Sequence, residues 1–224
     1  MRIVSWNCNG KFREKFREIQ KLNADIYVIQ ECENPVTTNN PEYNDFAINY
    51  IWGGHSKNKG LGVFANKSII LQNNNWDSYC LKNFLSVRIN NKFDLVAVWA
   101  CKPYIEEYYI YQSIHIDKYN SNTILIGDFN SNQIWDNSYG DRNHSQTVSE
   151  LNEAGLVSAY HYITGEKQGK EKQNTFYLYR HFDKGYHIDH CFINKSNIKT
   201  YKIENKEIWL SYSDHIPIIL ETVI

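Results

Sequence analysis

Acidic, amide and imidazole side chains stand at the ends of several apolar segments of this chain. The segment "ILIGDFNSN" leads from buried-strand residues into Asp128 and Asn130, and "RIVSWNCNG" leads into Asn7 and Asn9. A carboxylate at the mouth of a buried strand is costly unless it is paired or binds a ligand. These segments therefore indicate a site for chemistry as well as for packing.

Three further segments carry groups of the same kind. "DIYVIQE" ends in Glu31, "YHIDHCFI" holds Asp189, and "WLSYSDHIPIILE" places Asp214 and His215 just before an apolar run. Taken singly, each segment has an ordinary explanation, because strand-end carboxylates are often solvated and asparagines often only form turns. Five such segments at the edges of one β core are better explained by a shared site.

The combination of these groups predicts a particular reaction. An acidic cluster repels itself unless a cation lies in it or one member is protonated. Oxygen ligands without thiolates favour Mg²⁺ or Mn²⁺ over zinc. With amides and an imidazole around it, such a cation suits a phosphodiester or phosphomonoester, because it neutralises phosphate oxygens while a carboxylate orients water.

The elements that must position these groups are mostly strands. Apolar runs predict strands at 2–6, 25–31, 46–52, 61–65, 123–128, 174–179, 187–193, 198–203 and 216–222, and a hairpin at 84–100. Helices are predicted at 11–23, 104–119 and 145–156, the last with Ser145 as N-cap and Gly155 as its stop. Because hairpins interrupt the alternation of strands and helices, two packed mixed sheets with helices outside fit better than one parallel sheet.

The composition of the 224 residues is that of an ordinary globular protein, with 42% hydrophobic and 22% charged residues. The formal net charge of -1 excludes a strongly basic nucleic-acid coat. It does not exclude an enzyme that handles a phosphodiester in a locally positive field. The length and the lack of a composition break predict a single catalytic domain over 1–224.

The five cysteines are odd in number and form no C-x-x-C pair, which predicts buried, reduced thiols at Cys8, Cys32, Cys80, Cys101 and Cys191. Reduced thiols predict a reducing compartment. No apolar signal-peptide core precedes the first motif, and no run approaches the roughly 20 apolar residues that span a bilayer. The chain is therefore expected to be a cytoplasmic monomer with no membrane partner.

The motifs "WNCNG", "IQE", "GDFN", "HID" and "SDH", in this order, resemble the signature of the endonuclease/exonuclease/phosphatase superfamily. The resemblance runs from Trp6 to His215, nearly the whole chain. It implies an α/β fold, a four-layer αββα sandwich of two mixed β-sheets flanked by helices. It also implies a Mg²⁺- or Mn²⁺-dependent hydrolase of phosphoester bonds, like exonuclease III and pancreatic-type deoxyribonucleases.

The resemblance implies a catalytic role for five residues. Asp128 matches the residue that orients or deprotonates the attacking water, Asn130 the amide that holds the phosphate, and Asn7 the amide that supports both. His215 matches the imidazole that binds the scissile phosphate, and Asp189 the carboxylate that pairs with it. An Asp–His pair raises the proton affinity of the imidazole, which favours the cation beside a phosphate.

The metal ligands and substrate contacts are implied in the same way. Glu31 matches the main Mg²⁺ ligand, with Asn9 and Asp214 near the metal. On the substrate side the chain departs from the family pattern, because His187 stands where an arginine is common, and Ala100 and Cys101 stand where a tyrosine or histidine is usual. His187, Arg180 and Lys102 are therefore the candidate substrate-binding residues, with Arg180 and Lys102 as local cations.

Three functions are compatible with these residues. The leading hypothesis is a Mg²⁺-dependent nuclease that cleaves DNA or RNA, with Trp52, Trp135 and Tyr179 as residues that could stack a base. The alternative is the same chemistry on a small phosphoester or a lipid headgroup, since fold and catalytic residues do not separate the two. A second alternative is a non-catalytic binding module, against which the complete set of catalytic residues argues.

Overall fold

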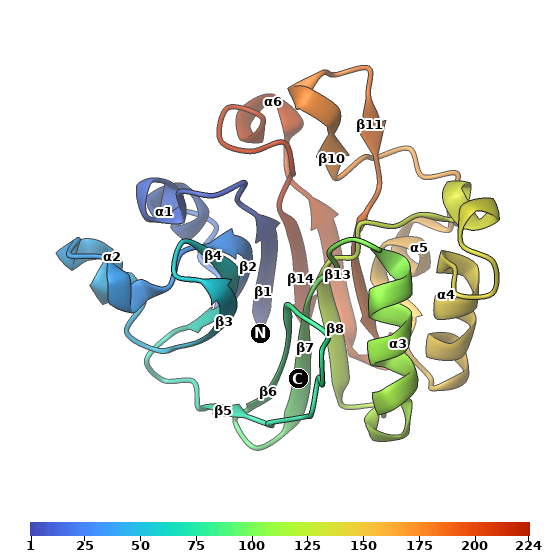
Figure 1. The fold of residues 1–224 in the computed structure, drawn as a ribbon, viewed down its shortest axis with the longest axis horizontal. Coiled ribbons are helices and arrows are strands. Elements are labelled where there is room, and N and C mark those ends of the chain that lie inside the picture. The colour runs from blue at the N-terminus through green and yellow to red at the C-terminus, as the bar shows by residue number, and fades with distance from the viewer.

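The computed structural model describes residues 1–224 as two six-stranded sheets packed face to face, with a short ribbon beyond them (Figure 1). Sheet A has the spatial order β13 (Ile198–Ile203), β14 (Ile218–Thr222), β1 (Arg2–Asn7), β2 (Ile26–Cys32), β4 (Lys59–Ala65) and β3 (Tyr50–Ser56). Sheet B has the order β5 (Leu71–Asn73), β6 (Phe84–Ile89), β7 (Phe93–Trp99), β8 (Thr123–Asp128), β12 (Asp189–Ile193) and β9 (Val157–Ser158). The ribbon pairs β10 (Phe176–Tyr177) with β11 (Gly185–Tyr186).

Both sheets are mixed, as the interrupted strand–helix alternation predicted. In sheet A, β1 is parallel to β2 and antiparallel to β14. In sheet B, β8 is parallel to β7 and antiparallel to β12. The chain therefore brings its first and last strands together at the centre of sheet A.

Helices cover the outer faces of the two sheets (Figure 1). The α-helices are α1 (Phe12–Gln20), α2 (Pro41–Phe46), α3 (Ile105–His115), α4 (His144–Glu153), α5 (Ala159–Thr164) and α6 (Lys206–Trp209). Short 3₁₀ helices are η1 (Pro35–Thr37), η2 (Ile116–Lys118), η3 (Gln133–Ser138), η4 (Leu178–Arg180) and η5 (Lys195–Asn197). Helices α1, α2 and α6 pack on sheet A, and α3 and α4 pack on sheet B.

Three apolar clusters separate these layers. One of 22 buried residues fills the space between the sheets, and includes Val28 and Ile126. Clusters of 18 and 14 buried residues lie under the helices of sheet A and sheet B. Strands such as β8 are buried on both faces, which explains why they appear in the sequence as continuous apolar runs. The four-layer αββα sandwich is confirmed.

The predicted strand at 46–52 is wrong in its first half. Phe46 ends α2, and β3 begins only at Tyr50. The side chain of Asn40 accepts hydrogen bonds from the N–H groups of Glu42 and Tyr43, and Pro41 occupies the first turn. An asparagine cap followed by proline starts a helix, and this local signal outweighs the apolar run that follows it.

Two further boundaries differ from the prediction. Asn143, not Ser145, caps α4, because its side chain accepts from the N–H of Gln146 while Ser145 bonds to Asp136 instead. The strand predicted at 174–179 is only two residues long. It ends because the next residues enter left-handed backbone conformations, with φ 54° and 60° at 179 and 180. The short elements β5, α5 and α6 were not predicted.

The cysteine prediction holds for three residues and fails for two. All five thiols are free, and Cys8, Cys32 and Cys191 are buried. Cys80 is exposed and Cys101 is only half-buried, because both lie in loops beside sheet B and not in its strands. No helix is long and apolar enough to cross a membrane.

Candidate active site

The polar strand ends predicted from the sequence lie at one end of the two sheets. Asn7 ends β1 and Glu31 lies near the end of the parallel strand β2. Asp128 ends β8 and Asp189 begins the antiparallel strand β12, so the two are direct cross-strand partners. Gly127 allows β8 to approach β7 here, since its φ is 152° and a Cβ would lie 2.0 Å from the Val98 carbonyl oxygen.

Asp128 is the most enclosed member of the group, with no exposed surface. Its Oδ2 accepts hydrogen bonds from Asn7 Nδ2 and Asn130 Nδ2, both at 3.0 Å. Its Oδ1 accepts from the backbone N–H of Asn130 at 2.9 Å. These three donors come from both sheets and fix the carboxylate in one orientation.

The imidazole of His215 lies between two carboxylates. Its Nδ1 donates to Asp189 Oδ2 at 2.9 Å, and its Nε2 lies 3.9 Å from Asp128 Oδ2. All three side chains are buried. The bond to Asp189 fixes the ring orientation and leaves the Nε2 edge directed toward Asp128.

The protonation of this group follows from burial and from its internal charges. Burial raises the pKa of Asp128 to about 7, with Asp189 adding to the shift and His215 opposing it. Burial alone would lower the pKa of His215, but the neighbouring Asp189 and Asp128 outweigh it and raise the pKa to about 10. The imidazole is therefore a cation at neutral pH, while Asp128 titrates close to neutrality.

Glu31 reaches the site through a β-bulge. The pairing of β2 with β4 shifts register between Gln30 and Cys32, and Glu31 has a φ of 62°. A bulge re-aims one side chain without ending the strand. Glu31 Oε1 lies 3.5 Å from Asn7 Nδ2, and Oε2 forms an ion pair with Lys59 Nζ at 2.8 Å. Lys59 was not among the residues predicted for the site.

The "SDH" segment is held against β1 by two hydrogen bonds that were not predicted. Trp6 Nε1 donates to the carbonyl of His215 at 3.0 Å, and Ser213 Oγ donates to the carbonyl of Asn7 at 2.7 Å. The first and last motifs of the sequence therefore bind each other directly. The only sequence signal was that Trp6 and Ser213 lie inside those motifs.

Thr175 joins the two segments that carry the Asp–His pair. Its Oγ1 accepts from the backbone N–H groups of Ile188 and Asp189, at 3.0 and 2.9 Å. Its carbonyl accepts from the N–H of Ile216 at 2.7 Å. Thr175 is fully buried, and no feature of the sequence distinguished it from an ordinary strand residue.

Asn9 and Asp214 lie at the rim of the group. The backbone N–H of Asn9 donates to Asn7 Oδ1 at 3.0 Å, and the side chain of Asn9 is exposed. Asp214 is half-buried, and its charge contributes to the raised pKa of His215. Both side chains face toward solvent more than the central carboxylates do.

The three predicted substrate-binding residues are not part of this hydrogen-bonded group. The His187 ring is 2% exposed and is bonded through Nδ1 to the carbonyl of Gln173, so it cannot reach a substrate without rearrangement. Arg180 is exposed on η4, where its guanidinium donates to two carbonyls at 3.4 Å. Lys102 is exposed, two residues after Ala100, whose carbonyl accepts from Asn130 Nδ2 at 3.0 Å.

An aromatic cavity of about 440 Å³ adjoins the group at Asn130. Its walls include Tyr104, Trp135, Tyr139, Phe176 and Tyr186. Trp135 is thus one of the predicted stacking residues that lies beside the site. Trp52 does not line this cavity, and its half-buried indole donates to the carbonyl of Cys32.

The donors present fit a hard divalent cation at the rim of the site. Ligand atoms of Asp128, Asp189 and His215 lie within 4.8 Å of one another. The protonated His215 has no free lone pair, however, so this inner group already holds its own positive charge. Glu31 and Asp214 remain as anionic oxygen donors, and oxygen ligands are those that Mg²⁺ and Mn²⁺ prefer.

The sequence model of the Endonuclease/Exonuclease/phosphatase family matches residues 4–215. Solved structures with similar folds include a 3'-5' exonuclease from Neisseria meningitidis (TM-score 0.74, 17% identity, 99% of each chain covered). They also include a 3' phosphatase from Neisseria bound to product DNA hairpin (0.73, 16%, 100% of each) and an AP endonuclease from Archaeoglobus fulgidus (0.69, 16%, 100% of each). A search of curated proteins finds no match.

Proposed function

Because this chain belongs to the Endonuclease/Exonuclease/phosphatase family, and so is a phosphoester-hydrolysing enzyme, we propose that it is a divalent-metal-dependent nuclease acting on DNA or RNA. The observation that carries the proposal is the joint geometry of Asp128 and His215. A buried carboxylate that titrates near neutrality lies beside an imidazolium that remains charged far above neutrality. Asp128 can accept a proton while His215 binds an anion.

Asp128 is the proposed general base. A base is most effective when its pKa lies close to the working pH, and burial brings the pKa of Asp128 to about 7. Asn7 and Asn130 hold its two oxygens, so the carboxylate does not reorient when a water molecule approaches. Asp128 would take the proton of that water as its oxygen attacks phosphorus.

His215 is the proposed phosphate ligand. Its Nε2–H is free of a short hydrogen bond, while Nδ1–H is held by Asp189 at 2.9 Å. A preorganised cationic donor stabilises the charge that develops on the phosphate oxygens in the transition state. Asp189 would keep the ring charged and correctly turned.

The proposed metal ligands are Glu31, Asp214 and Asn9. A Mg²⁺ or Mn²⁺ ion bound there would neutralise the non-bridging oxygens of the phosphate. Glu31 presents its carboxylate because of the β2 bulge, and a metal ion there would compete with Lys59, which pairs with that carboxylate. Arg180 and Lys102, which are both exposed, are proposed to contact the substrate backbone further out.

A polynucleotide fits the surroundings of the site better than a small phosphoester. The aromatic cavity beside Asn130, of about 440 Å³, is large enough for a nucleobase, whose flat ring can stack on aromatic side chains. Beyond it, η4 carries Tyr179, which is 78% exposed, together with the exposed Arg180. The similar structures include an exonuclease, a 3' phosphatase bound to product DNA hairpin and an AP endonuclease. The net charge of -1 favours the small-phosphoester alternative, but only weakly.

A cleavage panel tests the proposal directly. Fluorescent DNA and RNA, single- and double-stranded, would be incubated with Mg²⁺, with Mn²⁺ and with chelator, beside bis(p-nitrophenyl) phosphate as the small substrate. Asp128→Asn is the control for a contaminating nuclease. We expect cleavage of at least one nucleic acid, with affinity that falls as salt rises because phosphate contacts release counterions. Turnover of the small ester alone would support the alternative function instead.

A further inference from the structure

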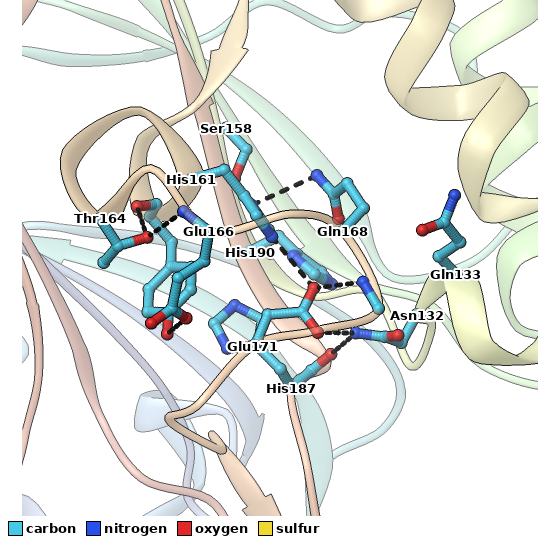
Figure 2. Close-up of polar contacts among 12 residues, drawn as sticks. Asn132, Gln133, Ser158, His161, Thr164, Glu166, Gln168, Glu171, His187 and His190 are labelled. Atoms are coloured by element: carbon cyan, nitrogen blue, oxygen red, sulfur yellow. Dashed lines mark hydrogen bonds and ion pairs between the residues drawn. The ribbon is translucent and has the colours of Figure 1, made fainter.

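A second group of polar side chains, most of them buried, surrounds Glu171 outside the catalytic group (Figure 2). Its members come from the loop after β8, from α4, β9 and α5, from the loop 165–175, and from β12 with the residue pair before it. The central member is Glu171, which lies between His161 and Asn132 (Figure 2). Nothing in the proposed mechanism uses these residues directly.

Glu171 is a carboxylate satisfied by hydrogen bonds alone. Oε1 accepts from His161 Nε2 at 3.0 Å and from the N–H of Gly169 at 2.9 Å, and Oε2 accepts from Asn132 Nδ2 at 3.1 Å. Burial raises the pKa of Glu171, but these donors outweigh it and lower the pKa to about 2. The group is therefore ionised throughout the neutral range and holds its donors in fixed directions.

The histidines around Glu171 are held in place by hydrogen bonds to their ring nitrogens. Ser158 Oγ and Gln168 Nε2 both lie within bonding distance of His161 Nδ1, at 2.7 and 3.2 Å, which leaves the proton of His161 on Nε2 for Glu171. Burial lowers the pKa of His144 to about 4, and it lowers the pKa of His190 as well. Each ring thus has a fixed tautomer and a fixed direction of donation.

Two bonds connect this network to the backbone on both sides of Asp189. Asn132 Nδ2 donates to the carbonyl of His187 at 3.0 Å as well as to Glu171. His190 Nε2 donates to the carbonyl of Ser131 at 2.9 Å. The segment that carries Asn130 at its start is therefore joined to the residues that precede and follow Asp189.

These side-chain hydrogen bonds join the two segments beyond the end of the backbone pairing between β8 and β12. The register of β8 with β12 ends at the pair Asp128 and Asp189, and only one further backbone bond, from the N–H of Phe129 to Ile188, follows it. Beyond that point the spacing of the two segments depends on side chains. The spacing matters, because it sets the distance between Asn130, which orients Asp128, and the Asp189–His215 pair.

We propose that Asn132 and Glu171 are positioning residues, which hold the Asp189–His215 pair at its working distance from Asn130, the residue that orients Asp128. This inference rests on the proposed function for its catalytic consequence, but its structural consequence does not depend on it. The opposing interpretation is that the network only stabilises the fold. The two differ in whether the Asp189–His215 hydrogen bond changes when the network is broken.

The experiment compares two variants with a matched control. Asn132→Ala removes the hydrogen bonds from Asn132 Nδ2 to Glu171 and to the His187 carbonyl. Glu171→Gln keeps the shape of the side chain but places an NH₂ group where the carboxylate accepted hydrogen bonds. Asn74→Ala is the control, because Asn74 Nδ2 also bonds a carboxylate, Asp94 Oδ1, and a hydroxyl, Ser86 Oγ, both at 2.8 Å, but near the other end of sheet B. Thermal unfolding gives the stability of each variant.

The first measurement needs no substrate. The Nδ1 proton of His215, in a short charge-assisted bond to Asp189, should give a far-downfield ¹H NMR signal that is assigned by its loss in His215→Ala. We expect this signal to shift upfield or broaden in Asn132→Ala and Glu171→Gln and to persist in Asn74→Ala. A signal that stays unchanged in both network variants overturns the proposal.

The second measurement uses whichever substrate the cleavage panel identifies. We expect kcat to fall on the order of ten- to a hundred-fold in both network variants, the scale for loss of a partner that orients a site residue. KM should change little, because neither side chain meets the substrate. Unchanged kcat at equal folded fraction, or a loss matched by Asn74→Ala, would also overturn the proposal. If no substrate is cleaved, the proposed function fails while the NMR result still decides the positioning role.

A milder variant guards against misfolding. Gln168→Met removes the half-buried amide that links the His161 and His144 rings, and it buries no new charge. If Asn132→Ala does not fold, Gln168→Met should show the same NMR change in weaker form. If Gln168→Met instead gave the same His215 signal as the wild type, the result would contradict the positioning role of the network.

Discussion

Asp128 and Asp189 face each other directly across the antiparallel pair of β8 and β12. Two carboxylates in this position repel each other unless a positive charge separates them or one is protonated. His215 supplies that charge, with Nδ1 at 2.9 Å from Asp189 and Nε2 at 3.9 Å from Asp128. The three groups therefore share their protonation, and a change to one should appear in the pH dependence of the others.

The first prediction concerns the Asp189–His215 pair. His215→Ala should cost about 2.7–4 kcal/mol of transition-state stabilisation, the scale for loss of one preorganised donor. Asp189→Asn should move the alkaline limb of the pH–rate profile downward, because Asp189 helps to raise the pKa of His215 to about 10. It should move the acid limb downward too, since Asp189 also raises the pKa of Asp128. Turnover against pH measures both limbs.

The double variant of this pair tests whether the two residues act as a unit. Losses in kcat should be far from additive, with the double variant little worse than His215→Ala alone. Strictly additive losses, or an alkaline limb that does not move in Asp189→Asn, would show that the pair does not work as described.

The second prediction concerns stability. Because burial raises the pKa of Asp128 to about 7, the folded state binds more protons than the unfolded state between about pH 4 and pH 7, and stability falls as pH rises through this window. Asp128→Asn removes this titration. It should abolish turnover, and its free energy of unfolding should fall less than that of the wild type between pH 4 and pH 8, by about 1–2 kcal/mol. Urea unfolding in chelator at both pH values measures the difference, and an equal or larger fall in the variant would contradict this prediction.

The third prediction concerns metal binding. Glu31→Gln should weaken binding of Mg²⁺ or Mn²⁺ in calorimetry, because it removes the charged donor. Lys59→Met should instead tighten binding by up to about five-fold, the equivalent of a surface ion pair of roughly 0.2–1 kcal/mol, since Lys59 pairs with Glu31 at 2.8 Å. Activity in excess chelator, or weaker metal binding by Lys59→Met, would refute this arrangement.

The fourth prediction concerns the thiols. Cys80 is exposed and should react quickly with an alkylating reagent, without loss of activity. Cys101 should react slowly, because burial raises the pKa of its thiol to about 11. Mass spectrometry of the modified sites, followed in parallel with turnover, separates the two. Fast inactivation that substrate prevents would place Cys101 in the site instead.

The sequence could predict this fold because the features that specify it are local or repetitive. Continuous apolar runs specified the buried strands, and polar groups at their ends marked one edge of the sheets. The register that makes Asp128 and Asp189 partners is not local, because it depends on pairing across 61 residues of chain. No pattern within either segment specifies that partner.

The parts of the site that could not be predicted depend on backbone irregularities and on long-range contacts. Glu31 was identified as a polar strand end, but the bulge that aims it, with φ of 62°, has no sequence signal. Lys59 was not predicted, because only the pairing of β4 with β2 places it beside Glu31. Thr175 is an ordinary strand residue in the sequence, and only the fold shows what its hydroxyl and carbonyl bind.

The pairing of β1 with β14 sets the time at which this enzyme can become active during its synthesis. Asn7 precedes Ser213 by 206 residues, and His215 can join it only when Ser213 and β14 dock against β1. A chain emerging from the ribosome therefore carries no complete site until β14 has been made and has docked. Because such long-range closure is slow to form, the site should be completed late in folding.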